Sequence, residues 1–340
     1  MAAQGIRERT TLRRTGFLVA ALLMLVVAAF LSLAVGSRDM SLGTVWSALL
    51  HGGDSPDAVV VRSMRVPRTV VGIAVGAALG LAGTVMQGLT RNPIAEPGIL
   101  GISTGAAVGV VTAIAVFGVG SLTGYVWFGL AGALLTGVAV YAVASRGRGG
   151  ATPVKLALAG QALAASLGAV VTGILTTDQR TLDEYRFWLA GSLSGRTADV
   201  AWQVLPFLAV GATLVIAVAR GLDALALGDD VAAGLGRNVA AIRIVGGLGA
   251  VVLTGAAVAA TGPIAFVGLA VPHAARALVG TDHRWVLAMS AVLAPALLLV
   301  SDVIGRVIFP PAEVGVGVMT ALLGVPVLIL LVRRRPVAAA

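Results

Sequence analysis

Long apolar runs, separated by short polar breaks, recur along the whole chain. One helix needs about 20 consecutive apolar residues to cross a bilayer, and such runs are too numerous here for a soluble domain with a single anchor. The pattern therefore predicts an all-α polytopic membrane protein. We expect ten transmembrane helices, over residues 16–35, 66–89, 98–117, 121–144, 154–176, 200–219, 240–261, 266–279, 285–305 and 316–332.

The composition agrees with a membrane protein and excludes several kinds of chemistry. Hydrophobic residues make up 58% of the chain and charged residues 11%, whereas about a quarter of the residues of an average soluble protein are charged. The net charge of +9 comes from arginines at the ends of the apolar runs, which indicates membrane topology rather than nucleic-acid binding. The lack of cysteine excludes disulfides, thiolate nucleophiles and cysteine metal ligands.

The basic residues at the two ends of the chain predict its orientation. An even number of spans places both termini on one side, and Arg7 to Arg14 together with Arg333 to Arg335 mark that side as cytoplasmic. The first run follows basic residues, as in a signal peptide, but it is long and has no convincing cleavage site. We interpret it as a retained span.

Three arginines do not fit this orientation. Arg62, Arg65 and Arg68 precede the second span on the side that we expect to be outside. Any one of them could simply reach to the membrane interface with its guanidinium group. For the cluster, either the topology is wrong or the arginines have a function on the outer side.

The chain contains an internal repeat with an offset of 170 residues, half its length. Pro93, Ile94, Ala95 and Gly98 recur as Pro263, Ile264, Ala265 and Gly268. With five spans between equivalent positions, the two halves, approximately 60–180 and 235–335, are predicted to be inverted copies, a plan typical of transporters. We predict structural turns at Asn92, Pro93, Glu96, Pro97 and Gly98 in the first copy and at Gly262, Pro263 and Gly268 in the second.

The first copy, in the stretch RNPIAEPG, raises the question of whether Glu96 is a reactive acid. Residues before proline are biased away from helical geometry, and Asn92 and Glu96 both precede a proline. We therefore expect a turn on the cytoplasmic side, in which Glu96 is a structural polar residue.

The polar residues within the spans give little indication of catalysis or of ion coupling. The three histidines are scattered, so no metal site is expected, and His273 is interpreted as structural. Acids are almost absent from the spans, apart from Asp302, whose spacing predicts a helical pair with Arg306. No phosphate-binding loop of the G-x-x-x-x-G-K-[ST] type occurs, so we expect no nucleotide site of that kind.

One polar segment, residues 220–238, has an imperfect amphipathic pattern. Leu225, Leu227, Val231 and Leu235 recur at helical spacing, and Asp229 and Asp230 suit the first turn of a short helix. The segment is either an ordinary solvated loop helix or an element that docks into the groove of a partner.

Five stretches together resemble a known family. They are similar to the FecCD-type permeases of ATP-binding-cassette (ABC) importers. The stretches are residues 65–106 (RVPRTVVGIAVGAALGLAGTVMQGLTRNPIAEPGILGISTGA), 188–193 (WLAGSL), 225–238 (LALGDDVAAGLGRN), 262–276 (GPIAFVGLAVPHAAR) and 301–309 (SDVIGRVIF). That family takes up iron-siderophores, haem and vitamin B12. The resemblance implies a type II importer architecture and one permease domain over 1–340. We expect an iron-siderophore as the substrate, with haem or cobalamin as the alternative and an ion-coupled secondary transporter as a more distant one.

The resemblance also implies partners and site residues. It implies a location in the cytoplasmic membrane, a second permease subunit, identical or homologous, and two cytoplasmic ATPase subunits that hold ATP and magnesium. An extracytoplasmic binding protein would dock on Arg65, Arg68 and Arg306. No cofactor is expected on this chain. The coupling residues implied on the ATPase side are Leu227, Gly228, Asp229, Asp230, Ala233, Leu235 and Gly236.

Overall fold

The computed structural model describes residues 2–36, 40–52, 55–146, 152–309 and 312–334. Throughout this part of the chain the regular structure is helical, as predicted. Arg335, which contributed to the predicted orientation, lies outside the described residues.

Seven described helical segments are long and apolar enough to cross a membrane. They are α1 (Ala2–Ala34, apolar from Thr10), the continuous run of α3 (Pro56–Val60), the π-helix η1 (Val61–Arg65) and α4 (Val66–Thr90), then α6 (Leu122–Ala144), α7 (Pro153–Thr177), α9 (Ala198–Ala217), α12 (Val239–Thr261) and α14 (His283–Val307). Three predicted spans correspond to shorter apolar helices, α5 (Ile102–Ala115), α13 (Val267–Val279) and the start of α15 (Val316–Arg334). Every predicted span thus coincides with an apolar helix, and the count of ten crossings stays a prediction.

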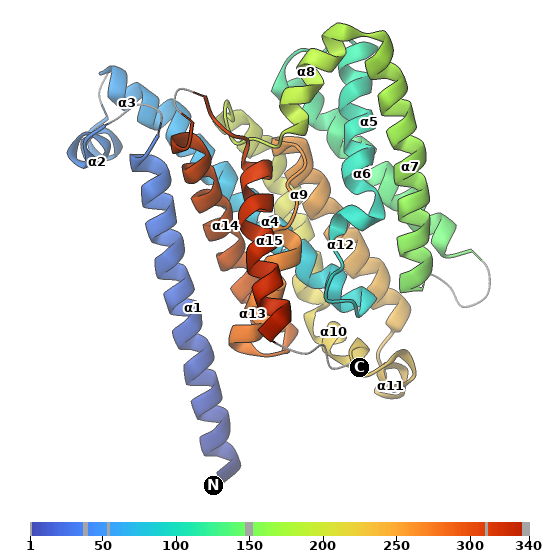
Figure 1. The fold of residues 1–340 in the computed structure, drawn as a ribbon. Coiled ribbons are helices and arrows are strands. Elements are labelled where there is room, and N and C mark those ends of the chain that lie inside the picture. Colours follow the sequence, from blue (N-terminus) through green and yellow to red (C-terminus); the bar gives the residue numbers. More distant parts are fainter. Residues whose placement is uncertain (1, 37–39, 53–54, 147–151, 310–311, 335–340) are drawn as a thin grey trace.

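Helices α4 and α12 form the centre of the bundle. Both are largely buried, and one hydrophobic core, which includes Val75, Val85, Leu253 and Ala256, continues through both halves of the chain. Around this pair lie α5, α6, α9, α13 and α14, whereas α1 and α7 lie at the periphery (Figure 1).

Short helices cap the two ends of the bundle. In Figure 1, α2 (Leu42–Leu50), α3 and α8 (Gln179–Leu189) lie at the upper end. The start of α1, the end of α15, α10 (Ala219–Leu225) and α11 (Asp229–Gly234) lie at the lower end. Both described ends of the chain therefore lie on the same side as the predicted coupling segment, opposite the three arginines.

Glycines allow α4 to pack closely on its neighbours. A side chain at Gly76 would meet the backbone of Pro295 in α14, and one at Gly83 would meet the backbone of Gly268 in α13. Small residues are the main means by which helix backbones approach each other in a membrane. Gly76 and Gly83 therefore allow α4 to lie against α14 and α13.

The two halves run in opposite directions. Helix α4 ends at the lower end, where Arg91 contacts Asp229, and α12 ends at the upper end, where the Thr261 carbonyl accepts from the Ser192 amide at 2.8 Å. The short helices that follow them occupy opposite halves of the molecule, α5 the upper half and α13 the lower half (Figure 1). This arrangement agrees with the inverted repeat predicted from the sequence.

Candidate functional site

Two of the three predicted docking arginines close the end of α1. The last carbonyl groups of a helix have no partner within the helix. Arg65 donates through Nη1 to the carbonyls of Leu33 and Ala34, at 2.8 and 2.7 Å. Arg306 donates through Nη1 to those of Ser32 and Val35, at 3.0 and 2.8 Å. The negative end of the helix dipole favours both cations.

The burial of these two arginines differs from the docking surface that the family resemblance implied. Arg65 and Arg306 are only 5% and 2% exposed. Their burial is explained by the carbonyls of α1, which are distant in the sequence and could not be foreseen. In this conformation neither guanidinium group is displayed to a partner, and a docking role for either stays a prediction.

Arg68 is the docking candidate nearest to solvent, and two acids hold it. Its Nε and Nη2 atoms form a bidentate pair with Asp302, at 3.0 and 2.8 Å, and its Nη1 lies 2.9 Å from Glu313 Oε2. Asp302 also pairs with Arg306 at 3.1 Å, which confirms the predicted i, i+4 pair. Asp302 is thus a buried acid between two arginines.

A cavity of about 420 Å³ opens beside these residues. It is lined by Arg65, Arg68, Arg306, Glu313 and Arg196. The Nε atom of Arg196 donates to the Ser192 carbonyl at 3.1 Å. Burial lowers the pKa of Arg196, and an interaction with Tyr125 partly offsets this. Four arginines and, among the described residues, one acid line this cationic cavity, so it favours anionic groups.

The repeated turns do not remain at the two ends of the bundle. Arg91, with a left-handed φ of 49°, ends α4, and the Asn92 side chain accepts from the Ile94 amide at 3.1 Å. The chain then turns back, so that Glu96 and Pro97 line a small cavity with Leu79, half way along α4. Glu96 is therefore part-buried about half way along α4, whereas the sequence predicted a turn at the cytoplasmic end of the bundle.

Glu96 joins the two copies of the repeat. Its Oε1 atom accepts a hydrogen bond from the Phe266 amide at 3.0 Å, across 170 residues of sequence. Since 170 is also the offset of the repeat, Glu96 and Phe266 occupy equivalent positions. Phe266 precedes α13, whose first amides lack helical partners. The acid therefore caps a helix that begins inside the bundle, where the positive end of the dipole favours a carboxylate.

Other polar contacts strengthen this junction. Gln87 donates through Nε2 to the Leu269 carbonyl at 3.2 Å and accepts from Arg276. The buried Thr254 hydroxyl, which has no hydrogen-bond partner among the described residues, lines the same cavity as Glu96, of about 110 Å³. Hydropathy alone did not reveal that this carboxyl group lies in the interior, because Glu96 is in a polar stretch between two spans.

Replacing Glu96 with alanine should destabilise the protein by about 1–3 kcal/mol, because it leaves the part-buried Phe266 amide without its acceptor. Glutamine keeps a carbonyl oxygen at this position and should recover most of the loss. Thermal unfolding in detergent, with hydrogen exchange of residues 266–269, measures both effects. Glu184, an acid on α8 with an exposed arginine partner, provides the control for general loss of a carboxylate. An alanine variant with wild-type unfolding and unchanged exchange would contradict the capping role.

At the lower end, the predicted coupling segment forms two short helices. Gly228 (φ 109°) and Gly236 (φ 74°) adopt conformations that suit glycine and bound α11, and Asp229 and Asp230 occupy its first turn as predicted. Leu227 and Leu235 are 63% and 62% exposed. The structure places Val231, Ala233 and Gly236 on the surface as well, whereas Leu225 is buried and does not belong to the expected amphipathic face.

Asp229 connects α11 to two long helices. It pairs with Arg91 at the end of α4 and, at 2.8 Å, with Arg243 in the second turn of α12. A second link joins Asp223 of α10 to His283 at the start of α14, where the distance from Asp223 Oδ1 to His283 Nδ1 is 2.7 Å. Side-chain contacts therefore link the predicted coupling segment to α4, α12 and α14. Sequence reasoning missed Arg91, Arg243 and Asp223, whose partners lie on separate elements.

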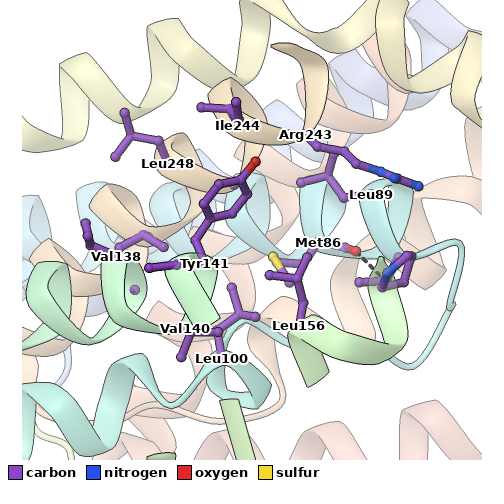
Figure 2. Close-up of a pocket in the computed structure, with 16 residues that line it drawn as sticks. Met86, Leu89, Leu100, Val138, Val140, Tyr141, Leu156, Arg243, Ile244 and Leu248 are labelled. Carbon is purple, nitrogen blue, oxygen red and sulfur yellow. Dashed lines mark hydrogen bonds between the residues drawn. The ribbon is translucent and has the colours of Figure 1, made fainter. Parts of the chain in front are cut away.

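An apolar cavity of about 240 Å³ lies beside this link. Figure 2 shows Met86 and Leu89 of α4, Tyr141 of α6, Leu156 of α7 and Ile244 of α12 around it, with Arg243 next to Leu89. The helices that surround it come from three separate stretches of the sequence, so no local pattern predicts it.

Comparisons with known proteins agree with this geometry. The FecCD transport family matches residues 24–334. The ferric enterobactin transport system permease protein FepD of Escherichia coli K12 is 45% identical over 92% of this chain and 94% of its own length. The probable siderophore transport system permease protein YfiZ of Bacillus subtilis 168 is 40% identical over 93% of this chain and 95% of its own length.

A solved structure described as an inward-facing conformation of a metal-chelate type ABC transporter superposes with a TM-score of 0.83. It is 28% identical, with 94% of this chain and 100% of that chain covered. Together with the apolar helices, these matches show an integral membrane protein. The chain belongs to the FecCD transport family.

Proposed function

We propose that the chain is the permease subunit of an ABC importer and that it translocates an iron-siderophore complex. The observation that carries this proposal is the exposed α11 segment, which presents apolar side chains to a partner while Asp229 ties it to α4 and α12. The names of FepD and YfiZ support a siderophore as the substrate.

In this proposal the lower end faces the cytoplasm and the membrane is the cytoplasmic one. All ten apolar helices cross or enter it, with α5 and α13 each filling part of its thickness. Two ATPase subunits, which hold ATP and magnesium, bind α10 and α11. A second permease subunit, identical or homologous, completes the translocation path. A binding protein delivers the cargo at the upper end, next to the cationic cavity.

Uptake of radioactive iron tests the substrate class. Cells that lack the gene should lose uptake of ferric siderophores and regain it when the intact gene is restored. Uptake of haem and of cobalamin is measured in the same cells. Restoration of haem or cobalamin uptake alone would replace the siderophore assignment. If none of the three depended on the gene, the importer function itself would be refuted.

Replacing Leu227 and Leu235 with serine should abolish co-purification of the ATPase subunits and stop uptake. Both side chains are well exposed, so the substitutions remove an apolar docking face without opening a cavity. Phe187 on α8, 70% exposed at the opposite end, supplies the control substitution. Normal ATPase recovery with the double variant would rule out coupling through this face.

Replacing Glu313 with glutamine should raise the affinity for the binding protein several-fold. Glu313 holds one edge of the Arg68 guanidinium group, and a carboxylate of the binding protein would have to displace it. Asp302 still holds the other edge, so the fold should be retained. Measuring the affinity of the immobilised permease for the binding protein, with Glu184→Gln as the control, tests this prediction. Unchanged or weaker affinity would argue against docking on Arg68.

A further inference from the structure

A short helix at the upper end, α2, has three distinct faces. It begins after Ser41, whose Oγ accepts from the Thr44 amide at 3.1 Å. Side chains three or four positions apart share a helix face. Val45 and Ala48 form a buried face, and Thr44 and Ser47 form a polar one. Trp46, Leu49 and Leu50 form the third face, which is apolar and exposed.

The buried face fixes the orientation of α2 on the bundle. Val45 and Ala48 pack in one cluster with Ala58 of α3 and Val61 of η1, and Leu33 of α1 packs against this cluster. The exposed Trp46 face is therefore held in place relative to the helices that enter the membrane. It is 58% exposed at Trp46 and 61% at Leu50.

Helix α2 follows an exposed apolar surface of α1. Helix α1, which is apolar and peripheral, exposes Val27, Phe30 and Leu31 in its last turns before α2. Figure 1 shows α2 at the upper end on the α1 side of the molecule, away from α8. The residues of α2 (LGTVWSALL) carry no charge, which removes the complementarity that a soluble partner would use. Tryptophan is enriched at membrane-water interfaces.

We infer that α2 is an interfacial helix, with the Trp46, Leu49 and Leu50 face inserted at the boundary between the phospholipid headgroups and acyl chains. Thr44 and Ser47 then face water, and Val45 and Ala48 face the protein. Apolar area and an aromatic ring supply the binding, as in other helices that lie in the plane of a membrane. Since α2 packs on η1, which ends at Arg65, its contact with lipid sets the height of the cationic cavity above the membrane.

The chain has no cysteine, so each introduced cysteine is a unique labelling site. Separate Trp46→Cys, Leu50→Cys and Ser47→Cys variants would carry a nitroxide spin label. The full chain would be reconstituted in vesicles of phosphatidylcholine and phosphatidylglycerol. Relaxation by dioxygen, which partitions into lipid, is compared with relaxation by a water-soluble nickel chelate. The label at Ser47, on the polar face, is the matched control. A label at Val27→Cys on α1 gives the reference value for a side chain exposed to the acyl chains.

Labels at 46 and 50 should show a several-fold higher ratio of oxygen to nickel accessibility than the label at 47, and should lie at shallower depth than the label at 27. The proposal is overturned if 46 and 50 are as accessible to the nickel chelate as 47 is. It is also overturned if they become protected only when an extracytoplasmic binding protein is added, because the face would then be a protein contact. The result does not depend on transport, so it stands or fails separately from the importer function.

Discussion

Replacing Asp302 with alanine is expected to reduce the free energy of unfolding by about 3–5 kcal/mol, since removal of one partner leaves buried charges uncompensated. Asp302 is 2% exposed and pairs with both Arg68 and Arg306. Without it, Arg306 keeps only its hydrogen bonds to the end of α1, and Arg68 keeps only Glu313. The thermal unfolding midpoint in detergent, followed by size-exclusion chromatography, measures the loss.

The matched control is Asp183→Ala. Asp183 pairs with Arg186 on the exposed surface of α8 at 3.2 Å, and exposed pairs contribute little to stability. The Asp302→Asn variant distinguishes the loss of the negative charge from the loss of packing, because the amide fills the same space but carries no charge. If the Asp302 and Asp183 variants unfolded alike, the buried triad would not stabilise the upper end of the bundle.

Replacing Gly83 with alanine should destabilise the protein by about 3 kcal/mol, the upper end of the usual cost of overpacking. The added methyl group would meet the carbonyl and Cα of Gly268, and backbone atoms in the first turn of α13 cannot rotate away as a flexible side chain can. Helix α13 would have to separate from α4, and the Glu96 cap would weaken with it.

Gly173→Ala in α7 supplies the comparison, because no atom that an added Cβ would meet lies within 4 Å of it. In a helix interior that substitution is expected to be neutral or stabilising. The unfolding midpoints of the two variants distinguish the effect of the packing clash from the effect of helix propensity. Iron uptake is the second measurement. Equal stability of both variants would show that α4 and α13 adjust freely at this contact.

Features with a local signal could be predicted from the sequence. The ten apolar runs all became helices, and the recurring Pro-Ile-Ala and glycine residues revealed the repeat. Features that depend on distant segments could not. The burial of Arg65 and Arg306 is caused by the carbonyls of α1, and the depth of Glu96 by the return of the chain alongside α4. Leu225 matched the amphipathic spacing, yet packing of α10 against α4 and α14 buries it.

The sequence pattern predicts no helix in residues 36–65, between the first two predicted spans. They form α2, α3 and the π-helix η1 in their described parts. Helix α2 is too short for its hydrophobic pattern to stand out, and its three faces become apparent only once Val45 and Ala48 are seen to be buried. The cationic cavity was likewise only half foreseen, since Arg196 and Glu313 come from connections without a recognisable motif.

The contact of Glu96 with Phe266 has a geometric consequence. Two equivalent positions of inverted copies can touch only close to the pseudo-two-fold axis that relates them. A relative rotation of the two halves about that axis moves distant contacts most and contacts on the axis least. In the predicted inverted arrangement the carboxylate therefore lies close to that axis, at a contact that such a rotation would displace least.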